Sequence, residues 1–175
     1  MEPTTAPFDW LDLISKAAGP VIAAFIAAFL AAKFAVNRFY KEKWWEKRLA
    51  AFTEVIDLAY KLKMTEDYYL EVESMKEDLQ SRDFKRHPPE TERSLTDSYW
   101  ETVQEIERIA QLSEFTLTSK ASSIVNAFLK RRQSTRDAFN EDSLTTFEAA
   151  NEDYAAAEDL LSSLVAEAKR ELKVK

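Results

Sequence analysis

The sequence predicts an all-α protein with one N-terminal transmembrane helix followed by an antiparallel bundle of about four helices. Three observations lead to this prediction. Apolar residues run from Ile14 to Val36, a stretch long enough to cross a bilayer. Amphipathic stripes at helical spacing recur through the rest of the chain. Helix breakers are rare: Gly19 is the single glycine, and the prolines occupy positions 3, 7, 20, 88 and 89.

Residues 1–13 are predicted to form a short extracytoplasmic N-terminus, and residues 14–36 the transmembrane helix. At 1.5 Å per residue this helix would cover roughly 35 Å, against a hydrocarbon core of about 30 Å. The span is weakly hydrophobic, because half of the uncharged segment from Ala17 to Ala32 is alanine. A buried helix of a soluble protein and a cleaved signal peptide are the alternatives. Three acidic residues and one lysine before the apolar core argue against a signal peptide, since such peptides begin basic.

Charge around the span predicts its orientation. Six basic residues lie between positions 33 and 48, whereas only Lys16 precedes the uncharged core. The positive-inside rule therefore places the N-terminus outside and the C-terminal domain in the cytoplasm, with the protein in the cell membrane, the inner membrane in a bacterium. Aromatic residues at both ends are typical of interfacial belts, and membrane lipid is the expected partner there. The predicted interface residues are Trp10, Lys33, Arg38, Tyr40, Lys41, Lys43, Trp44 and Trp45.

The span contains a tandem four-residue pattern, AAFI, AAFL and AAKF. Small residues recur every four positions and so lie near one line along the helix. Such faces allow two helix backbones to approach closely in lipid. The pattern predicts a homo-oligomer, although chance in an alanine-rich span or packing against another membrane protein would produce it too. The predicted self-association residues are Gly19, Ala23, Ala27, Ala31 and Ala35.

Four further helices are predicted beyond the span, and the first of them continues from it. Residues 37–80 form a juxtamembrane and first bundle helix, because Trp45, Leu49, Phe52 and Ile56 recur at spacings of 4, 3 and 4. Residues 81–90 form a loop, since a proline pair disfavours helix before it. Residues 91–175 supply three helices, and Ser119 is the predicted N-cap of the second of these. Because the connecting loops are short, neighbouring helices are expected to pack as an antiparallel bundle. The three stripes comprise Leu95, Tyr99, Val103, Ile106 and Ala110; Ala121, Ile124, Val125, Phe128 and Leu129; and Phe147, Ala150, Tyr154, Ala157, Leu161, Leu164, Ala168 and Leu172.

The net charge of −7 is unevenly distributed: −2 for residues 1–32, +4 for residues 33–48 and −9 for residues 49–175. An acidic domain repels phosphates, so nucleic acid is not expected as a partner. The acidic pairs Glu66–Asp67 and Glu152–Asp153 are interpreted as solvated helix faces. One basic cluster departs from this acidic field and is a possible docking site for an acidic partner or nucleic acid, the alternative being pairing with neighbouring acidic helices or with solvent. It comprises Lys130, Arg131, Arg132 and Arg136.

The sequence contains no recognisable catalytic, metal-binding or cofactor-binding motif. It has no cysteine and one histidine, His87. Phe84 stands three residues before His87, so the Glu-x-x-His motif of di-iron bundles is absent. A single glycine allows neither a Gly-x-Ser-x-Gly elbow nor a glycine-rich phosphate loop. We therefore expect no enzyme, with no catalytic residues and no bound metal or cofactor.

The layout resembles that of small uncharacterised bacterial single-span membrane proteins with a cytoplasmic helical domain. The resemblance covers the single span, the segment FYKEKWWEKRLAAFTEVIDLAYKL and the C-terminal stretch LLSSLVAEAKRELKV. Some proteins of this design are anti-phage effectors, so the resemblance implies a bacterial inner-membrane protein and raises the prospect of a defence role.

The predicted function is that of a non-enzymatic single-pass membrane protein. Its span would self-associate, and its cytoplasmic bundle would receive a protein partner or a trigger, with a defence effector acting on the membrane as the sharpest version. The alternative is a membrane-anchored adaptor or accessory subunit that tethers a cytoplasmic partner protein.

Overall fold

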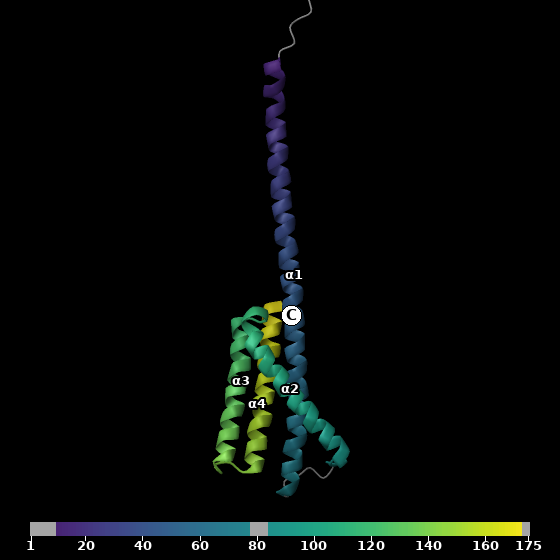
Figure 1. The fold of residues 1–175 in the computed structure, drawn as a ribbon, viewed down its shortest axis with the longest axis vertical. Coiled ribbons are helices and arrows are strands. Elements are labelled where there is room, and N and C mark those ends of the chain that lie inside the picture. Colours follow the sequence, from purple (N-terminus) through teal and green to yellow (C-terminus); the bar gives the residue numbers. More distant parts are fainter. Residues whose placement is uncertain (1–9, 78–83, 173–175) are drawn as a thin grey trace, which may run out of the picture. The chain divides into compact units, whose positions relative to one another are not determined.

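The computed structural model describes residues 10–77 and 84–172. These residues form four α-helices and no strands: α1 (Trp10–Lys76), α2 (Pro89–Thr116), α3 (Ser119–Asn140) and α4 (Thr146–Leu172) (Figure 1). The prediction of an all-α chain is confirmed. The chain divides into two compact units, Met1–Glu46 and Lys47–Lys175, and α1 contributes residues to both.

The first unit holds the apolar part of α1. Every described side chain from Ile22 to Glu46 is exposed, including Phe25, which is 74% exposed, and Phe29, which is 69% exposed. By length and composition, one helix among the described residues could cross a membrane, within Ile22–Lys76, and none of its most apolar window is buried. Pro20 lies inside α1, so the single proline of the predicted span does not end the helix.

The second unit has a closed apolar core to which all four helices contribute. Phe52, Val55 and Leu62 of α1 are at most 1% exposed, as are Ile106 of α2 and Leu164 of α4. Burying each such side chain contributes roughly 1.5–3 kcal/mol. The remaining core side chains are Ala59, Val103, Ile109, Leu117, Ala121, Val125, Phe128, Ala156, Ala157, Leu160 and Ala168.

Side-chain pairs within the second unit identify which helices are neighbours. Arg48 of α1 pairs with Glu171 of α4, and Lys63 pairs with Glu158. Helices α3 and α4 lie side by side in Figure 1, and Arg131 of α3 contacts α4 at two carboxylates.

The boundaries of the helices differ from prediction by a few residues, and the physical reasons are local. Helix α2 begins at Pro89, before position 91, because proline at the start of a helix loses no hydrogen bond. Thr118 rather than Ser119 caps α3, and its hydroxyl accepts the N–H of Ala121 at 3.1 Å. The predicted loop at 81–90 is irregular from 84 to 88, while 81–83 lie outside the described residues, as do 78–80 at the end of the predicted first helix.

Two predicted stripes are also shifted. Trp45 belongs to the first unit and is 50% exposed, so the buried stripe of α1 starts at Phe52. In α4 the fully buried leucines are Leu160 and Leu164, whereas Leu161 is only partly buried at the edge of the core.

Candidate functional site

The residues predicted to meet the membrane interface lie on the exposed surface of the first unit. Lys33, Tyr40, Lys41, Trp44 and Trp45 are all exposed. Trp10 opens α1, and its side chain lies outside the described ones.

Two of the basic residues predicted to meet the membrane interface pair with carboxylates of their own helix. Arg38 contacts Glu42 at 2.8 Å, and Lys43 contacts Glu46 at 2.7 Å. Both pairs are exposed, and exposed pairs contribute little stability.

The small residues predicted to mediate self-association are also exposed. A Cβ added at Gly19 would meet nothing within 4 Å. Among the described residues, no side chain covers this position, so the helix face is open at its N-terminal end. The four alanines of the stripe, Ala23, Ala27, Ala31 and Ala35, are exposed in the same way.

The four residues of the predicted basic cluster lie on α3 and have different contacts. Lys130 is exposed. Arg131 contacts Asp159 at 2.7 Å and Glu152 at 3.0 Å, both on α4, as the alternative of pairing with a neighbouring acidic helix expects. Arg132 and Arg136 instead point to the ring of Trp100 on α2, with each guanidinium carbon 5.4 Å from the ring centroid. These two arginines line a cavity.

The cavity has a volume of about 470 Å³ and takes residues from all four helices of the second unit. Both aromatic and charged side chains line it. Its lining comprises Glu66, Tyr69 and Glu73 of α1; Thr96, Tyr99 and Trp100 of α2; Arg132, Thr135, Arg136 and Phe139 of α3; and Thr146, Ala149, Ala150 and Asp153 of α4.

Glu66 is the most deeply buried carboxyl of the cavity, at 5% exposed. It follows the core residue Leu62 by four positions and so lies on the same face of α1. The hydroxyl of Tyr99 donates to its Oε1 at 2.7 Å. Burial raises the pKa of Glu66 to about 7, although the hydrogen bond from Tyr99 lowers it. The interpretation of Glu66 as part of a solvated face is therefore wrong, and only its neighbour Asp67 is exposed.

Tyr99 connects Glu66 to Arg132. The guanidinium of Arg132 donates to the Tyr99 hydroxyl oxygen from Nε at 3.3 Å and from Nη2 at 3.1 Å. Burial, and then the negative charge of Glu66, raise the pKa of Tyr99 above its ordinary value. Tyr99 therefore keeps its proton and acts as donor to Glu66 while it accepts from Arg132.

Asp153 of α4 is a partly buried carboxyl of the same cavity. Burial raises its pKa, and the charges of Arg132 and Arg136 act in the opposite direction. Its Oδ1 is buried and has no hydrogen-bond partner among the described residues. Among the described residues, no ion pair joins Asp153 to Arg132 or Arg136, although all three residues line the cavity.

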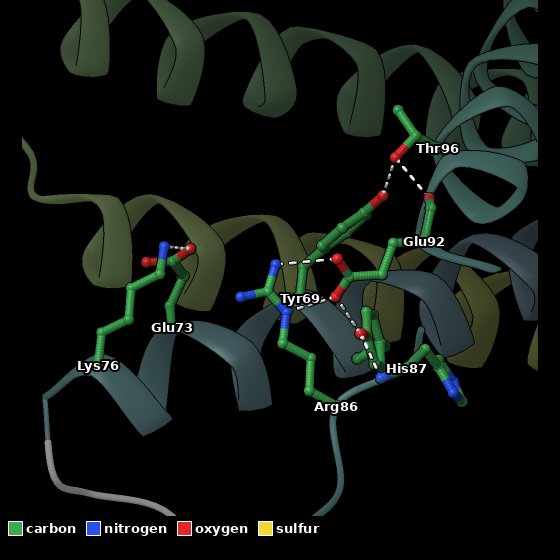
Figure 2. A network of polar contacts seen from close by, with 8 residues as sticks. Tyr69, Glu73, Lys76, Arg86, His87, Glu92 and Thr96 are labelled. Atoms are coloured by element: carbon green, nitrogen blue, oxygen red, sulfur yellow. Dashed lines mark hydrogen bonds and ion pairs between the residues drawn. The ribbon is translucent and has the colours of Figure 1, made fainter. Parts of the chain in front are cut away.

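A polar network at the cavity edge holds the segment from Phe84 to Pro88 (Figure 2). Arg86 donates two hydrogen bonds to Glu92, at 2.6 and 2.9 Å, and these are the main reason why the pKa of Glu92 falls to about 2. The Tyr68 hydroxyl donates to Glu92 at 2.5 Å and accepts the backbone N–H of His87 at 3.1 Å.

The same network reaches the cavity wall. The hydroxyls of Tyr69 and Thr96 lie 2.8 Å apart, and Thr96 donates to the backbone carbonyl of Glu92. Tyr69 and Thr96 both line the cavity, so the network that joins Arg86 to Glu92 extends to one of its walls.

Sequence reasoning missed the cavity, since Glu66 and Asp153 resemble ordinary surface acids in the sequence. A usable signal was present in the adjacent aromatic residues Tyr99 and Trp100, which cannot both face a core at neighbouring helix positions.

Comparison with family models, with curated proteins and with solved structures finds no match for this chain.

Proposed function

We propose that this protein is a non-enzymatic, single-pass membrane protein that self-associates through its span and carries a cytoplasmic antiparallel four-helix bundle. The observation that supports this most is the contrast between the two units. The second unit buries its apolar stripes in a core, whereas in the first unit apolar side chains such as Ile26 (56% exposed) and Phe34 (70% exposed) stay uncovered by the described part of the chain. Lipid is the solvent in which such a surface is stable.

The antiparallel arrangement is supported by the order of the pairs in the second unit. Between α1 and α4, Arg48 pairs with Glu171 and Lys63 pairs with Glu158. Residue numbers therefore increase along α1 in the direction in which they decrease along α4. Between α1 and α2, the Glu54–Arg108 and Glu66–Tyr99 contacts are ordered in the same way.

The cytoplasmic location of the bundle is supported by the basic residues that follow the apolar segment. Lys33, Lys41 and Lys47 are exposed and available to anionic headgroups, at about 1 kcal/mol each near such a surface. The acidic bundle would be repelled by that surface, so it would face partners in the cytoplasm.

The bundle would receive a protein partner or a trigger. In the sharper version the trigger releases an activity that disrupts the membrane, as in a defence effector. In the second version the bundle only tethers a partner protein, as an adaptor or accessory subunit does. Inducible expression separates them, because a released effector depolarises or arrests cells and an adaptor does not.

Membrane insertion and topology are tested with reporters fused after Lys175, together with cell fractionation. We expect a reporter that works only in the cytoplasm to be active, and the protein to sediment with membranes. Ile26→Arg should move protein to the soluble fraction, because an arginine at the centre of a span costs about 2.5–3.5 kcal/mol. Phe115→Arg is the matched control, since Phe115 is 76% exposed in the second unit. Activity only of a reporter that works outside, or equal sedimentation of the two variants, would contradict the proposal.

A further inference from the structure

We propose that the cavity of the second unit binds a small bipolar molecule, with an anionic group at one end and an N–H donor group at the other. Free amino acids and mononucleotides with an amino-bearing base are the two sources of that chemistry. The proposal goes beyond the membrane function, and it does not depend on the span.

The arginines of the cavity supply the site for the anionic end. Arg132 and Arg136 are one helical turn apart on α3, and both guanidinium groups lie over the ring of Trp100. Arg132 is further held by the Tyr99 hydroxyl. Among the described residues, Arg136 makes no ion pair and no side-chain hydrogen bond. Two guanidinium groups on one helix at the wall of a cavity suit a carboxylate or a phosphate, which they can bind with paired N–H donors.

The carboxyls supply the site for the N–H donor. Oδ1 of Asp153 is buried and lacks a partner within the described part of the chain. Glu66 is 5% exposed and receives its one described side-chain hydrogen bond at Oε1, from Tyr99. Buried polar atoms are nearly always paired in native proteins, so an unpaired carboxylate oxygen at a cavity indicates a missing donor.

The two sets of charges together select a bipolar ligand. A simple anion at the arginines would stand in the same cavity as Asp153 and would leave its buried Oδ1 without a donor. A simple cation at the carboxyls would be repelled by Arg132 and Arg136. A molecule with both groups satisfies both sets.

The size and walls of the cavity suit such a molecule. About 470 Å³ falls in the usual range for small-ligand sites, roughly 300–1,000 Å³. Tyr69, Tyr99 and Phe139 present aromatic surface for an apolar or planar body.

The test is isothermal titration calorimetry on the full-length protein in mild detergent. One arm uses the free L-amino acids, and the other uses AMP, CMP and GMP. Single-pole probes, namely phenethylamine, 3-phenylpropionate and ribose 5-phosphate, are titrated alongside. We expect at least one bipolar compound to bind with a Kd below about 1 mM, and its matching single-pole probes to bind at least about tenfold more weakly.

Variants locate the binding. Arg136→Gln and Asp153→Asn should each weaken the bipolar compound by about tenfold or more, which corresponds to about 1.4 kcal/mol. Lys130→Gln is the control, since Lys130 is exposed on α3 and does not line the cavity. Arg136 is exposed, so the Arg136→Gln variant should have the same melting temperature as the parent, measured by circular dichroism. This variant therefore still tests the proposal if Asp153→Asn fails to fold.

Three results would overturn the proposal: no binding in either arm, single-pole probes that bind as tightly as bipolar ones, or an Arg136→Gln variant that binds like the parent. Because the readout is binding by folded protein, it is independent of whether the span inserts, orients or self-associates as proposed above.

Discussion

The hydroxyl of Tyr99 donates a hydrogen bond to Oε1 of Glu66 over 2.7 Å and so connects α2 to α1 inside the cavity. Arg132 of α3 donates to the same hydroxyl oxygen. One phenol therefore links three helices, and its acceptor is a carboxyl whose pKa burial raises to about 7. This carboxyl changes its charge near neutral pH, and the stability of the second unit should follow it.

The first prediction concerns that titration. The folded-state pKa of Glu66 lies above its ordinary value of 4.5, so between the two the folded chain keeps a proton that the unfolded chain has released. The stabilisation from this proton is complete below about pH 4.5 and is lost as pH rises through about 7, at a cost of roughly 3 kcal/mol. Urea unfolding followed by circular dichroism at about pH 5 and pH 8 measures the loss.

Glu66→Gln supplies the control for this pH dependence, since the amide keeps an acceptor for Tyr99 but cannot ionise. Its stability should change much less between the two pH values than that of the parent. Asp153 also has a raised pKa and leaves a residual slope of the same sign, whereas Glu92 titrates near 2, below the tested window. Equal slopes in parent and variant would show that Glu66 is not the group responsible.

The second prediction concerns the segment after position 83. Tyr68→Phe removes the hydroxyl that donates to Glu92 and accepts the N–H of His87. We expect a loss of about 0.5–1.5 kcal/mol and faster hydrogen exchange at the His87 amide. Tyr60→Phe, at a residue that is 53% exposed on α1, is the matched control and should change neither. Unchanged exchange at His87 in Tyr68→Phe would argue against the network in Figure 2.

The third prediction concerns the face that α4 buries. Leu160→Asp should destabilise the second unit by several kcal/mol, because it places an unpaired carboxylate at a position that is 2% exposed. Leu161→Asp should cost clearly less, since Leu161 is only partly buried and its new charge can reach water. Thermal unfolding of the two variants gives the comparison. If Leu161→Asp proved the more damaging, α4 would be rotated by about 100° from the arrangement described.

The fourth prediction concerns the small-residue stripe of the proposed span. Ala27→Leu should weaken self-association, because a larger side chain holds two helix backbones apart. Phe25→Leu changes an apolar residue of the same segment outside the stripe and should leave association unchanged. A transmembrane-association reporter or crosslinking in detergent reads out both variants. Two variants that associate as strongly as the parent would remove this face from consideration.

Much of the fold was predictable from sequence because the signals are local. The absence of glycine and proline through most of the chain predicts long helices, and the Pro88–Pro89 pair predicts the break before α2. The apolar run from Ile14 to Val36 likewise needs no tertiary information to be recognised. Helix existence and approximate length follow from backbone chemistry within a few residues.

The predicted stripes contain core residues of all four helices, but only the tertiary structure decided where the edges of each buried face lie. Adjacent residues differ by 100° around a helix, so Leu160 and Leu161 are equally plausible core residues until the neighbouring helices are placed. For the same reason, the sequence does not determine that Arg131 pairs with α4 whereas Arg132 contacts Tyr99 of α2.

The candidate site shows this limit most clearly. Sequence composition determined that the chain has no catalytic motif, a basic segment after the apolar run and an acidic remainder. It did not distinguish Glu66 from Asp67, although one is buried and the other exposed. A carboxyl becomes a buried, neutral-pH titrating group only when other helices remove its water, and those helices lie more than 30 residues away in the chain, at Tyr99, Arg132 and Asp153.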